Sequence, residues 1–335
     1  MHTVGGTVGI VANPMSGRDI RRLVAQASVF PNAEKASMVL RIVAACAALG
    51  VRRVLVSTDA FGLAAAVLRG AQRQRIGVMP EFCEPRPATG QAADTTSLVW
   101  RMRELGAAVI VLLGGDGTVR AAVPALGDTP VLALSTGTNN AFPHVWEATV
   151  AGAAAALIAT NAVPAAAATT QAKVLTVACG GRRELALVDV CVSTVSHVGA
   201  RAVWQTASLR ELYCTFAEPH AIGLSSIAAH LLPTARDHVN GVAVRLDPAA
   251  NRRVLAPIAP GVLADVGVAL VRPLPPGEPM VSAVTRGTVA VDGEREIEFG
   301  PRQRVTVSLS GDGPRVVDVP AVLRIAAEKQ LLVTE

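Results

Sequence analysis

Aromatic residues are scarce in this chain, because Phe, Trp and Tyr together make up only 3% of its 335 residues. One Tyr and six Phe offer few rings on which nucleic-acid bases could stack, and the basic residues are scattered rather than gathered in a stripe. We therefore expect no nucleic-acid partner. The core must be built from Ala, Val, Leu and Ile, which suits a parallel sheet covered by helices on both faces.

Long apolar runs and cysteine pairs are also missing. No segment approaches about 18 to 20 uninterrupted apolar residues, and the first residues lack the basic and apolar parts of a secretory leader. The five cysteines include no Cys-x-x-Cys pair, which argues against a disulfide framework. The six histidines show no metal-ligand spacing, so no zinc site is expected. These absences predict a cytoplasmic protein without a membrane span.

The composition that is present describes a folded protein with an affinity for anions. Hydrophobic residues make up 51% of the chain and charged residues 17%, which excludes wholesale disorder. The length fits two domains of roughly 100 to 200 residues each. A net charge of +5 favours anionic ligands such as nucleotides.

The first part of the chain, residues 1–147, alternates between strand and helix patterns. We predict strands at 7–12, 51–57, 107–113 and 130–135, helices at 34–49, 61–69 and 94–105 and from 119, and a loop at 80–87. This alternation predicts a doubly wound α/β domain that binds nucleotides. Ligands of such sheets bind at the carboxyl ends of the strands.

The pattern changes after about residue 147 and predicts a β-rich, sandwich-like substrate domain over 148–319. Runs at 173–179 and 184–192 flank a Gly-Gly turn and predict a hairpin, and further strands are expected at 241–246, 262–271, 287–291 and 304–309. We expect a helical insert at about 201–231. Residues 320–335 should form a short helix and a closing strand that pack back on the first domain.

The strongest chemical signal is the turn Gly114-Gly115-Asp116-Gly117-Thr118, which follows a fully apolar strand. Glycines there let backbone N–H groups approach a polyanion, and the helix that follows adds a positive dipole. An acid inside such a turn would repel phosphate unless it binds Mg²⁺ or accepts a proton from an attacking hydroxyl. The alternative is a tight strand-to-helix turn in which Asp116 caps the helix.

Two more polar turns follow predicted strands. In Asn13-Pro14-Met15-Ser16-Gly17, Asn13, Ser16, Gly17 and the adjacent Arg18 could bind phosphate; alternatively Ser16 caps a helix and the arginine faces solvent. The third turn contains Gly137, Thr138, Asn139 and Asn140, which suit hydrogen bonds to a ribose or an adenine edge but are also ordinary turn formers. Three such turns in one domain predict a shared nucleotide site.

These turns together resemble the superfamily of NAD kinases, diacylglycerol kinases and sphingosine kinases. The segments 17–23 and 32–35 are more particular and resemble the ATP-NAD kinase branch that includes the acetoin-catabolism protein X family. The resemblance implies an α/β domain with a β-sandwich domain, and transfer of the γ-phosphoryl of ATP to the 2′-hydroxyl of NAD. Asp116 would orient or deprotonate that hydroxyl, and Mg²⁺ would be carried by the nucleotide phosphates.

The chain departs from NAD kinases at the substrate positions. Those enzymes carry an Asn-acid pair, for which Asn139-Asn140 and Asp189 are partial substitutes, and a Tyr-containing segment whose place is taken by 219–226. In that segment His220 and Ser225 are possible substrate contacts. Asp189 lies in an apolar strand, where a carboxylate must be paired, bound to metal or at the rim of a cleft. Asp292 precedes Gly293 in a hairpin-type turn, and an Asp-Gly-Glu also occurs in the lipid-kinase relatives.

Three functions stay open at this point. The first is an NAD kinase-like enzyme with ATP and Mg²⁺. The second is a kinase of a lipid or a small hydroxylated metabolite, and the third is a catalytically weak nucleotide-binding accessory of acetoin catabolism. We expect nucleotide substrates as partners, no membrane partner, and assembly as a homodimer or homotetramer.

Overall fold

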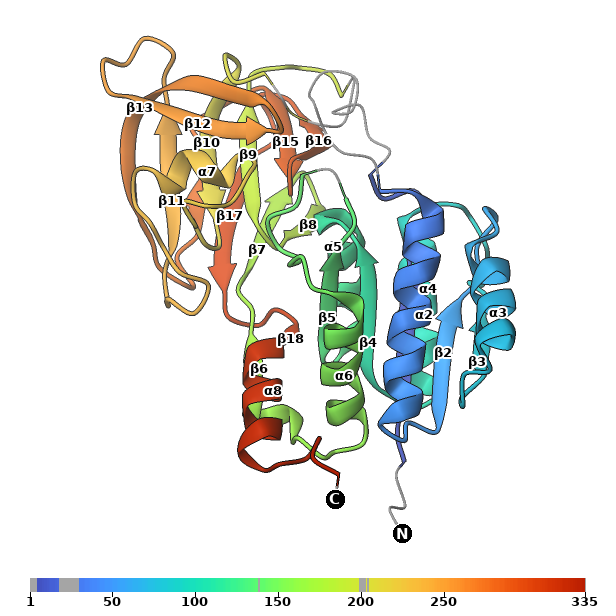
Figure 1. Ribbon diagram of the computed structural model, residues 1–335. Coiled ribbons are helices and arrows are strands. Elements are labelled where there is room, and N and C mark those ends of the chain that lie inside the picture. Colours follow the sequence, from blue (N-terminus) through green and yellow to red (C-terminus); the bar gives the residue numbers. More distant parts are fainter. Residues whose placement is uncertain (1–4, 18–29, 138, 199–202, 204, 335) are drawn as a thin grey trace.

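Two domains lie side by side in the computed structural model, which describes residues 5–17, 30–137, 139–198, 203 and 205–334 (Figure 1). The first is a mostly parallel sheet covered by helices, and the second is built from antiparallel sheets. This confirms the predicted fold class. Arg18 and Thr138, two of the candidate site residues, lie outside the described residues.

The first sheet has the strand order β3-β2-β1-β4-β5-β18-β6. Its strands are β1 (Thr7–Ala12), β2 (Arg53–Ser57), β3 (Pro80–Cys83), β4 (Ala107–Gly114), β5 (Val131–Ser135), β6 (Thr169–Gln171) and β18 (Arg315–Val317). From β1 the chain moves outward through β2 and β3, and it then returns to add β4 and β5 on the other side. The order therefore reverses between β1 and β4, and α/β sheets bind ligands at such a point.

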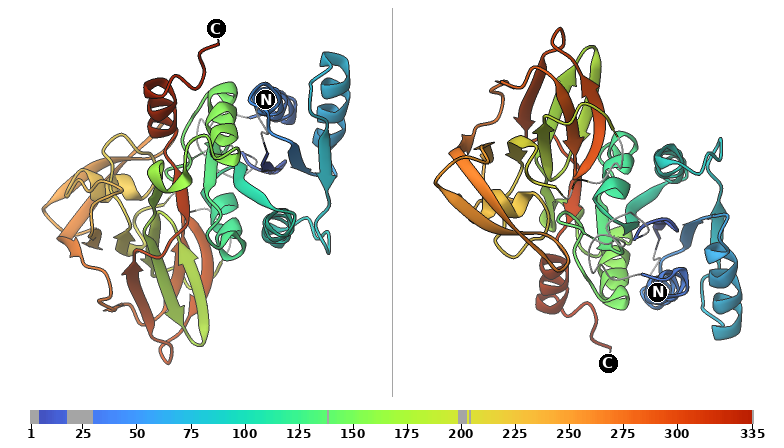
Figure 2. Two further views of the ribbon diagram at one scale, coloured as in Figure 1. Left: turned by 90° about the horizontal axis from the view of Figure 1, so that it is seen from below. Right: turned by 90° about the horizontal axis from the view of Figure 1, so that it is seen from above.

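Helices cover both faces of this sheet, as the two axial views show (Figure 2). They are α2 (Asn32–Ala48), α3 (Leu63–Gln74), α4 (Ala92–Glu104), α5 (Asp116–Leu126) and α6 (Ala148–Ala159). Side chains of β4 alternate between the faces, with Val109 and Val111 packed under α2 and α6 and Ile110 and Leu112 under α4 and α5. Because both faces are covered, β4 is apolar almost throughout.

The second domain contains two antiparallel sheets, of order β12-β13-β11-β10-β9-β15-β16 and β14-β17-β7-β8. The strands are β7 (Val174–Cys179), β8 (Arg182–Ala186), β9 (Asp189–Ser193), β10 (Leu209–Cys214), β11 (Gly241–Leu246), β12 (Arg253–Ala259), β13 (Val262–Leu274), β14 (Met280–Val281), β15 (Gly287–Val291), β16 (Glu294–Phe299) and β17 (Val305–Ser310). Apolar side chains from both sheets form one core between them, and the short helix α7 (Ser225–Ala229) covers the outer face of the larger sheet.

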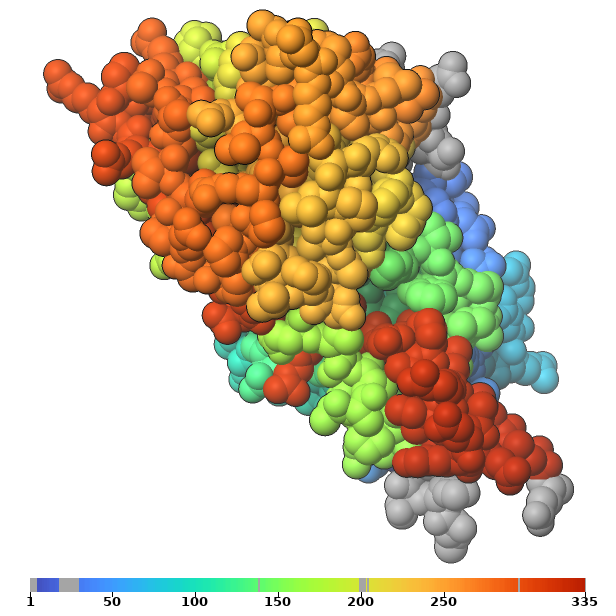
Figure 3. Space-filling view, turned by 90° about the vertical axis from the view of Figure 1, so that its left-hand side faces the viewer, coloured from blue at the N-terminus to red at the C-terminus, as the bar shows by residue number. Residues whose placement is uncertain are grey.

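The chain returns to the first domain at its end. Strand β18 pairs with β5, and helix α8 (Val319–Glu328) packs against α6, where Val319, Val322 and Ala326 join the core under α2. Figure 3 shows this helix, in red, below the yellow and orange segments of the second domain. The division expected at residue 147 falls between β5 and α6, whereas the first sheet continues through β18 and β6.

Four local predictions were wrong. Residues 80–83 form the edge strand β3 rather than a loop, since Pro is tolerated at the first position of an edge strand. The run 184–192 divides into β8 and β9 in different sheets. In 201–231 the described residues form the strand β10 and only a short helix, and 329–334 form turns rather than a closing strand.

No helix in the described part of the chain is both long enough and apolar enough to cross a bilayer. All five cysteines are buried thiols outside any disulfide, and burial raises the pKa of the Cys46 thiol to about 12. A thiol with such a pKa stays protonated, so Cys46 packs as a small apolar group.

Candidate functional site

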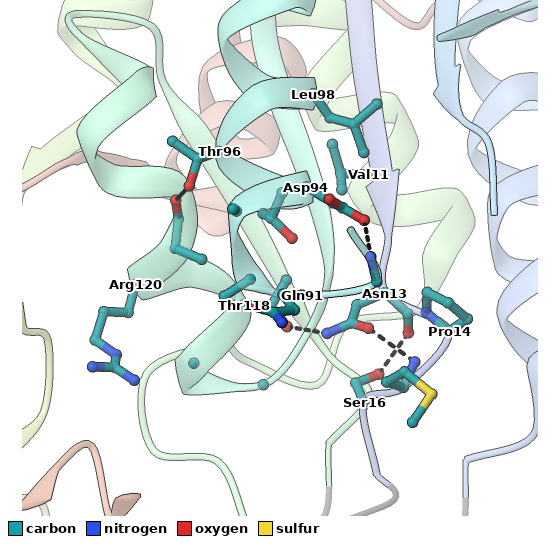
Figure 4. A pocket seen from close by; sticks show the side chains of 18 of the residues that line it. Val11, Asn13, Pro14, Ser16, Gln91, Asp94, Thr96, Leu98, Thr118 and Arg120 are labelled. Carbon is teal, nitrogen blue, oxygen red and sulfur yellow. Dashed lines mark hydrogen bonds between the residues drawn. The ribbon is translucent and has the colours of Figure 1, made fainter. Parts of the chain in front are cut away.

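A cleft of about 1200 Å³ lies at the carboxyl ends of β1, β2 and β4. The first domain supplies the turns after these strands and the start of α4, and the second domain supplies residues 183–185 and the hairpin from Asp292 to Glu296. Figure 4 shows side chains of the first domain that line this space, among them Asn13, Ser16 and Thr118. The cleft therefore occupies the place where the strand order reverses.

The three polar turns predicted from the sequence are joined by hydrogen bonds. Asn13 Nδ2 donates to Thr118 Oγ1 at 2.8 Å, which links the first turn to the second (Figure 4). Ser16 Oγ lies 3.0 Å from Thr136 Oγ1, and the backbone N–H of Thr136 donates to the carbonyl of Gly114 at 2.9 Å. The turns after β1, β4 and β5 thus form one continuous wall.

Two glycines in this wall are required by close packing. A Cβ on Gly114 would come within 2.4 Å of the Thr118 side chain, and one on Gly115 would come within 2.5 Å of Asn140 Oδ1. The Asn140 side chain cannot simply turn away, because its Nδ2 donates to Ser135 Oγ at 2.8 Å. Glycine is therefore needed here for the turns to approach one another, in addition to any role in binding phosphate.

Asp116 is the first residue of α5, and Gly115 is the cap of that helix. The alternative in which Asp116 caps the helix is thus wrong. Its carboxylate instead accepts from the backbone N–H groups of Ala141, at 3.1 and 3.2 Å, and Phe142, at 2.8 Å. These bonds fix the carboxylate between the second and third turns, where it lines the cleft.

A buried lysine supports the first turn. Lys35, on α2, has no exposed surface, and its Nζ donates to the carbonyls of Asn13 and Ser16 at 2.9 Å each. A buried ammonium must be surrounded by acceptors to offset its lost hydration. The Asn13–Gly17 turn supplies them, so Lys35 fixes the backbone of the wall from behind.

The second domain supplies acidic partners for Arg120, which lies on α5 one helical turn after Asp116. Its guanidinium lies 2.9 Å from Glu296 Oε1 and 3.6 Å from Asp292 Oδ2. Asp292 occupies a hairpin turn with positive φ at Asp292 and Gly293, 48° and 74°, as a type I′ turn requires. The cluster therefore joins α5 to the β15–β16 hairpin across the cleft.

The buried carboxylate of Asp292 explains the split between β8 and β9. It accepts from the backbone N–H groups of Leu187 and Val188 at 2.9 and 2.8 Å, so these amides are unavailable to a continuous strand. Burial raises the pKa of Asp292 to about 7; the Asp116 carboxylate adds to the rise, while Arg120 and the backbone amides oppose it. Asp292 thus changes charge near neutral pH.

This pKa predicts a pH-dependent stability. Because the folded protein holds the Asp292 proton more tightly than the unfolded chain does, its contribution to stability is full below the ordinary Asp pKa of about 4 and is lost as pH rises through about 7. Between pH 5 and 8 the free energy of unfolding of the wild type should therefore fall by about 2 kcal/mol relative to Asp292→Asn. Urea unfolding at several pH values measures this, with the exposed Asp265→Asn as control. Parallel curves for wild type and Asp292→Asn would contradict it.

The structure brings most of the predicted site residues to the cleft. Its lining includes Asn13, Ser16, Gly17, Gly115, Asp116, Gly117, Thr118, Gly137, Asn139, Asn140 and Asp292. Gly114 ends β4 and begins the second turn. Asp189 lines a smaller adjoining cavity of about 20 Å³, together with Asp116 and Asp292.

Two predicted substrate contacts lie elsewhere. His220 is exposed, with its Nε2 3.7 Å from Glu218 Oε2, and Ser225 is fully buried in α7. Neither lines the cleft or the smaller cavity. His220 and Ser225 thus lie outside both cavities, although Ile222, Gly223 and Leu224 of the same segment line the smaller one.

The sequence did not single out Lys35 or Arg120 as parts of the site, nor Arg236, whose Nη1 donates to the carbonyl of Phe142 at 2.9 Å. Arg120 had a usable signal, since it lies four residues after Asp116 and so projects from the same side of α5. Lys35 and Arg236 had none, because their partners are backbone carbonyls distant in the sequence.

The described lining of the cleft is predominantly acidic, although the whole chain is basic. It contains Asp59, Asp94, Asp116, Glu184, Asp292, Glu294 and Glu296, against Arg120 and Arg183. Among the residues that the structure describes, no three His, Cys, Asp or Glu side chains converge as a metal-binding group. Among these described residues, a polyanionic ligand would meet more like charge than opposite charge.

Comparison with known proteins agrees with this architecture. Residues 8–162 match the ATP-NAD kinase N-terminal domain, and residues 173–312 match the Acetoin catabolism protein X C-terminal domain. The acetoin catabolism protein X of Cupriavidus necator is 41% identical to this chain over an alignment of 339 positions, which covers 98% of this chain and 94% of that protein.

Fold, cleft and domain matches define a protein with an NAD kinase-type N-terminal domain, and they support a kinase-type role at the level of the family. The chain belongs to the acetoin catabolism protein X family. This confirms the resemblance noted in the sequence.

Proposed function

We propose that the protein is an ATP-dependent phosphotransferase that phosphorylates the 2′-hydroxyl of NAD or NADH to give NADP or NADPH. The observation that carries this proposal is the position of Asp116. Its carboxylate is held by two backbone N–H groups at the point where three polar turns meet, inside a cleft large enough for a nucleotide. The match to the ATP-NAD kinase N-terminal domain supports ATP and NAD as ligands.

In the proposed reaction Asp116 acts as general base. The acceptor's hydroxyl oxygen forms a bond to the γ-phosphorus, the bond from that phosphorus to the β,γ-bridging oxygen breaks, and ADP leaves. The proton of the hydroxyl passes to the Asp116 carboxylate. Most of the rate enhancement in such reactions comes from positioning and charge neutralisation, so the rigid wall formed by the three turns matters as much as the base.

The acidic lining of the cleft fits a nucleotide that arrives with Mg²⁺. With seven carboxylates and two arginines in the described lining, a bare triphosphate would be repelled. Mg²⁺ bound to the phosphates would offset the negative charge of the triphosphate, and the phosphates would supply most of its ligands. Asp116 and Asp292 are the carboxylates that line both cavities. The backbone N–H groups of 114–118 would hold the remaining phosphate oxygens.

The direct test is NADP formation. Purified protein is incubated with ATP, Mg²⁺ or Mn²⁺, and NAD or NADH, and NADP(H) is measured with an NADP-specific dehydrogenase. Formation that depends on ATP is the expected result. A wider panel of lipids and small hydroxylated metabolites is assayed for ATP consumption. If ATP is consumed with one of these compounds while no NADP(H) forms from NAD or NADH, the acceptor is that compound. No phosphorylated product with any acceptor would reject it.

One observation favours a second function, a nucleotide-binding accessory of acetoin catabolism with little catalytic activity. The third turn carries Asn139-Asn140 rather than an Asn-acid pair, and Asn139 Nδ2 is directed to the carbonyl of Ile258 at 3.3 Å. The affinity for NAD, measured by isothermal titration calorimetry beside the turnover of ATP, separates the two functions. Tight binding of NAD with no turnover of ATP would favour the accessory.

A further inference from the structure

We propose that Arg236, on the loop between α7 and β11 in the second domain, is a positioning residue that holds the candidate base Asp116 through a single peptide group. The inference rests on the proposed function for its kinetic consequence only. Its structural content, a coupling between the two domains at Asp116, is independent of the reaction.

The contacts of Arg236 lead directly to the backbone that binds Asp116. Its guanidinium donates to the carbonyls of Ala141 and Phe142, the latter at 2.9 Å. The N–H groups of the same two residues donate to the Asp116 carboxylate. Arg236 and Asp116 therefore bind opposite sides of one short segment.

The peptide between Ala141 and Phe142 carries both interactions at once. Its carbonyl accepts from a cation and its N–H donates to an anion, so each bond polarises the group and strengthens the other. Pro143 follows, which restricts Phe142 to an extended conformation. The segment is thus a stiff connector between the arginine and the carboxylate.

Arg236 is itself held firmly. Its guanidinium stacks on the ring of Phe216 at 4.2 Å from the centroid, and its Nε lies 3.2 Å from Glu218 Oε1. Both partners precede α7 in the chain, and Phe216 also packs into the core formed with β4, α4 and α5, so the arginine sits where the two domains join. Loss of its bonds to the two carbonyls would alter the orientation of the N–H groups that bind Asp116.

This arrangement exceeds what a surface ion pair needs. The guanidinium uses one edge for Glu218 and directs Nη1 and Nη2 at two backbone carbonyls of the other domain. A lysine could place one charge there but could not match this fork. The geometry therefore requires an arginine at this position.

Selective labelling can observe the connector without any assay of activity. The sequence contains only two Ala-Phe dipeptides, Ala60-Phe61 and Ala141-Phe142. Protein labelled with ¹³C at the Ala carbonyl and ¹⁵N on Phe therefore gives two cross-peaks in a carbonyl-selected experiment, and the Phe61 peak is an internal control. Asp116→Asn assigns the Phe142 peak, since it alters the acceptor of that N–H.

We expect Arg236→Met to shift the Phe142 amide proton in the same direction as Asp116→Asn does and to leave the Phe61 peak unmoved. An unchanged Phe142 peak in Arg236→Met would overturn the proposal. Arg236→Lys should give an intermediate shift, and it also covers the case in which the methionine variant fails to fold. A lysine variant with the wild-type Phe142 shift and the wild-type kcat would likewise overturn it.

Kinetics provide the second readout. With a productive acceptor, Arg236→Met should lower kcat by about 10- to 100-fold with KM nearly unchanged, because the base is misplaced while the binding surfaces remain. The control is Arg253→Met, which removes an exposed arginine paired with Asp265 on the same domain. A raised KM with an unchanged kcat, or equal effects in Arg236→Met and Arg253→Met, would overturn the positioning role. Absence of turnover in the wild type would instead reject the proposed function, and the spectra would still decide this inference.

Discussion

An Asp116→Asn variant is expected to lose about 100- to 10,000-fold of the wild-type kcat, the range typical of removing a general base. Asparagine has the same shape and keeps one oxygen that can accept from Phe142 N–H, so the wall of the cleft should persist. It cannot take the proton of an attacking hydroxyl. Steady-state kinetics with ATP and the productive acceptor measure the loss, and nucleotide affinity by calorimetry should change little.

The chain contains a matched control for this substitution. Asp312 occupies a second Gly-Asp-Gly sequence, which here forms an exposed turn far from the cleft lining. Asp312→Asn should leave kcat and KM at their wild-type values. If Asp116→Asn retained wild-type kcat while binding nucleotide normally, Asp116 would not be the base, and the accessory function would gain support.

A Lys35→Met variant should show the largest loss of stability among single changes near the site, about 2 to 4 kcal/mol in the free energy of unfolding. Methionine fills a similar volume but leaves the carbonyls of Asn13 and Ser16 without the ammonium, and each orphaned buried acceptor costs about 1–3 kcal/mol. Relief of the buried charge recovers part of this cost. Urea unfolding monitored by circular dichroism measures the difference.

The same variant should also bind nucleotide more weakly, because the first turn loses its support from behind. The exposed Lys329→Met, at the end of α8, is the control and should stay within about 0.5 kcal/mol of the wild type. Should Lys35→Met unfold at the wild-type urea concentration, the lysine would not be holding the turn.

The sequence predicted the part of the site that depends on local pattern. Asn13, Asp116 and Asn140 follow apolar strands, and in a parallel sheet the carboxyl ends of strands meet at one edge, so their shared cleft follows from strand order. The polar turns were visible for the same reason, since Gly, Asn and Ser interrupt runs of Val, Leu and Ile. The α/β assignment rested on this alternation as well.

The interactions that fix these turns were not predictable in the same way. Lys35 and Arg236 bind backbone carbonyls, which every residue possesses, so the sequence holds no complementary partner to search for. The break between β8 and β9 depends on Asp292, more than 100 residues later, whose carboxylate takes the amides of Leu187 and Val188. The return of the C-terminal helix to the first domain was expected, but the pairing of β18 with β5 depends on contacts that are formed only in the tertiary structure.

Phosphoryl transfer that depends on Asp116 can be followed at the phosphorus atoms of ATP by ³¹P NMR. Wild-type protein, Asp116→Asn and Asp312→Asn are each incubated with ATP, Mg²⁺ and NAD. We expect a phosphomonoester signal and the signals of ADP to grow together in the wild type and in Asp312→Asn, and neither to grow in Asp116→Asn. Equal growth of a phosphomonoester with Asp116→Asn, or unchanged ATP in the presence of the wild type and every acceptor tested, would contradict it.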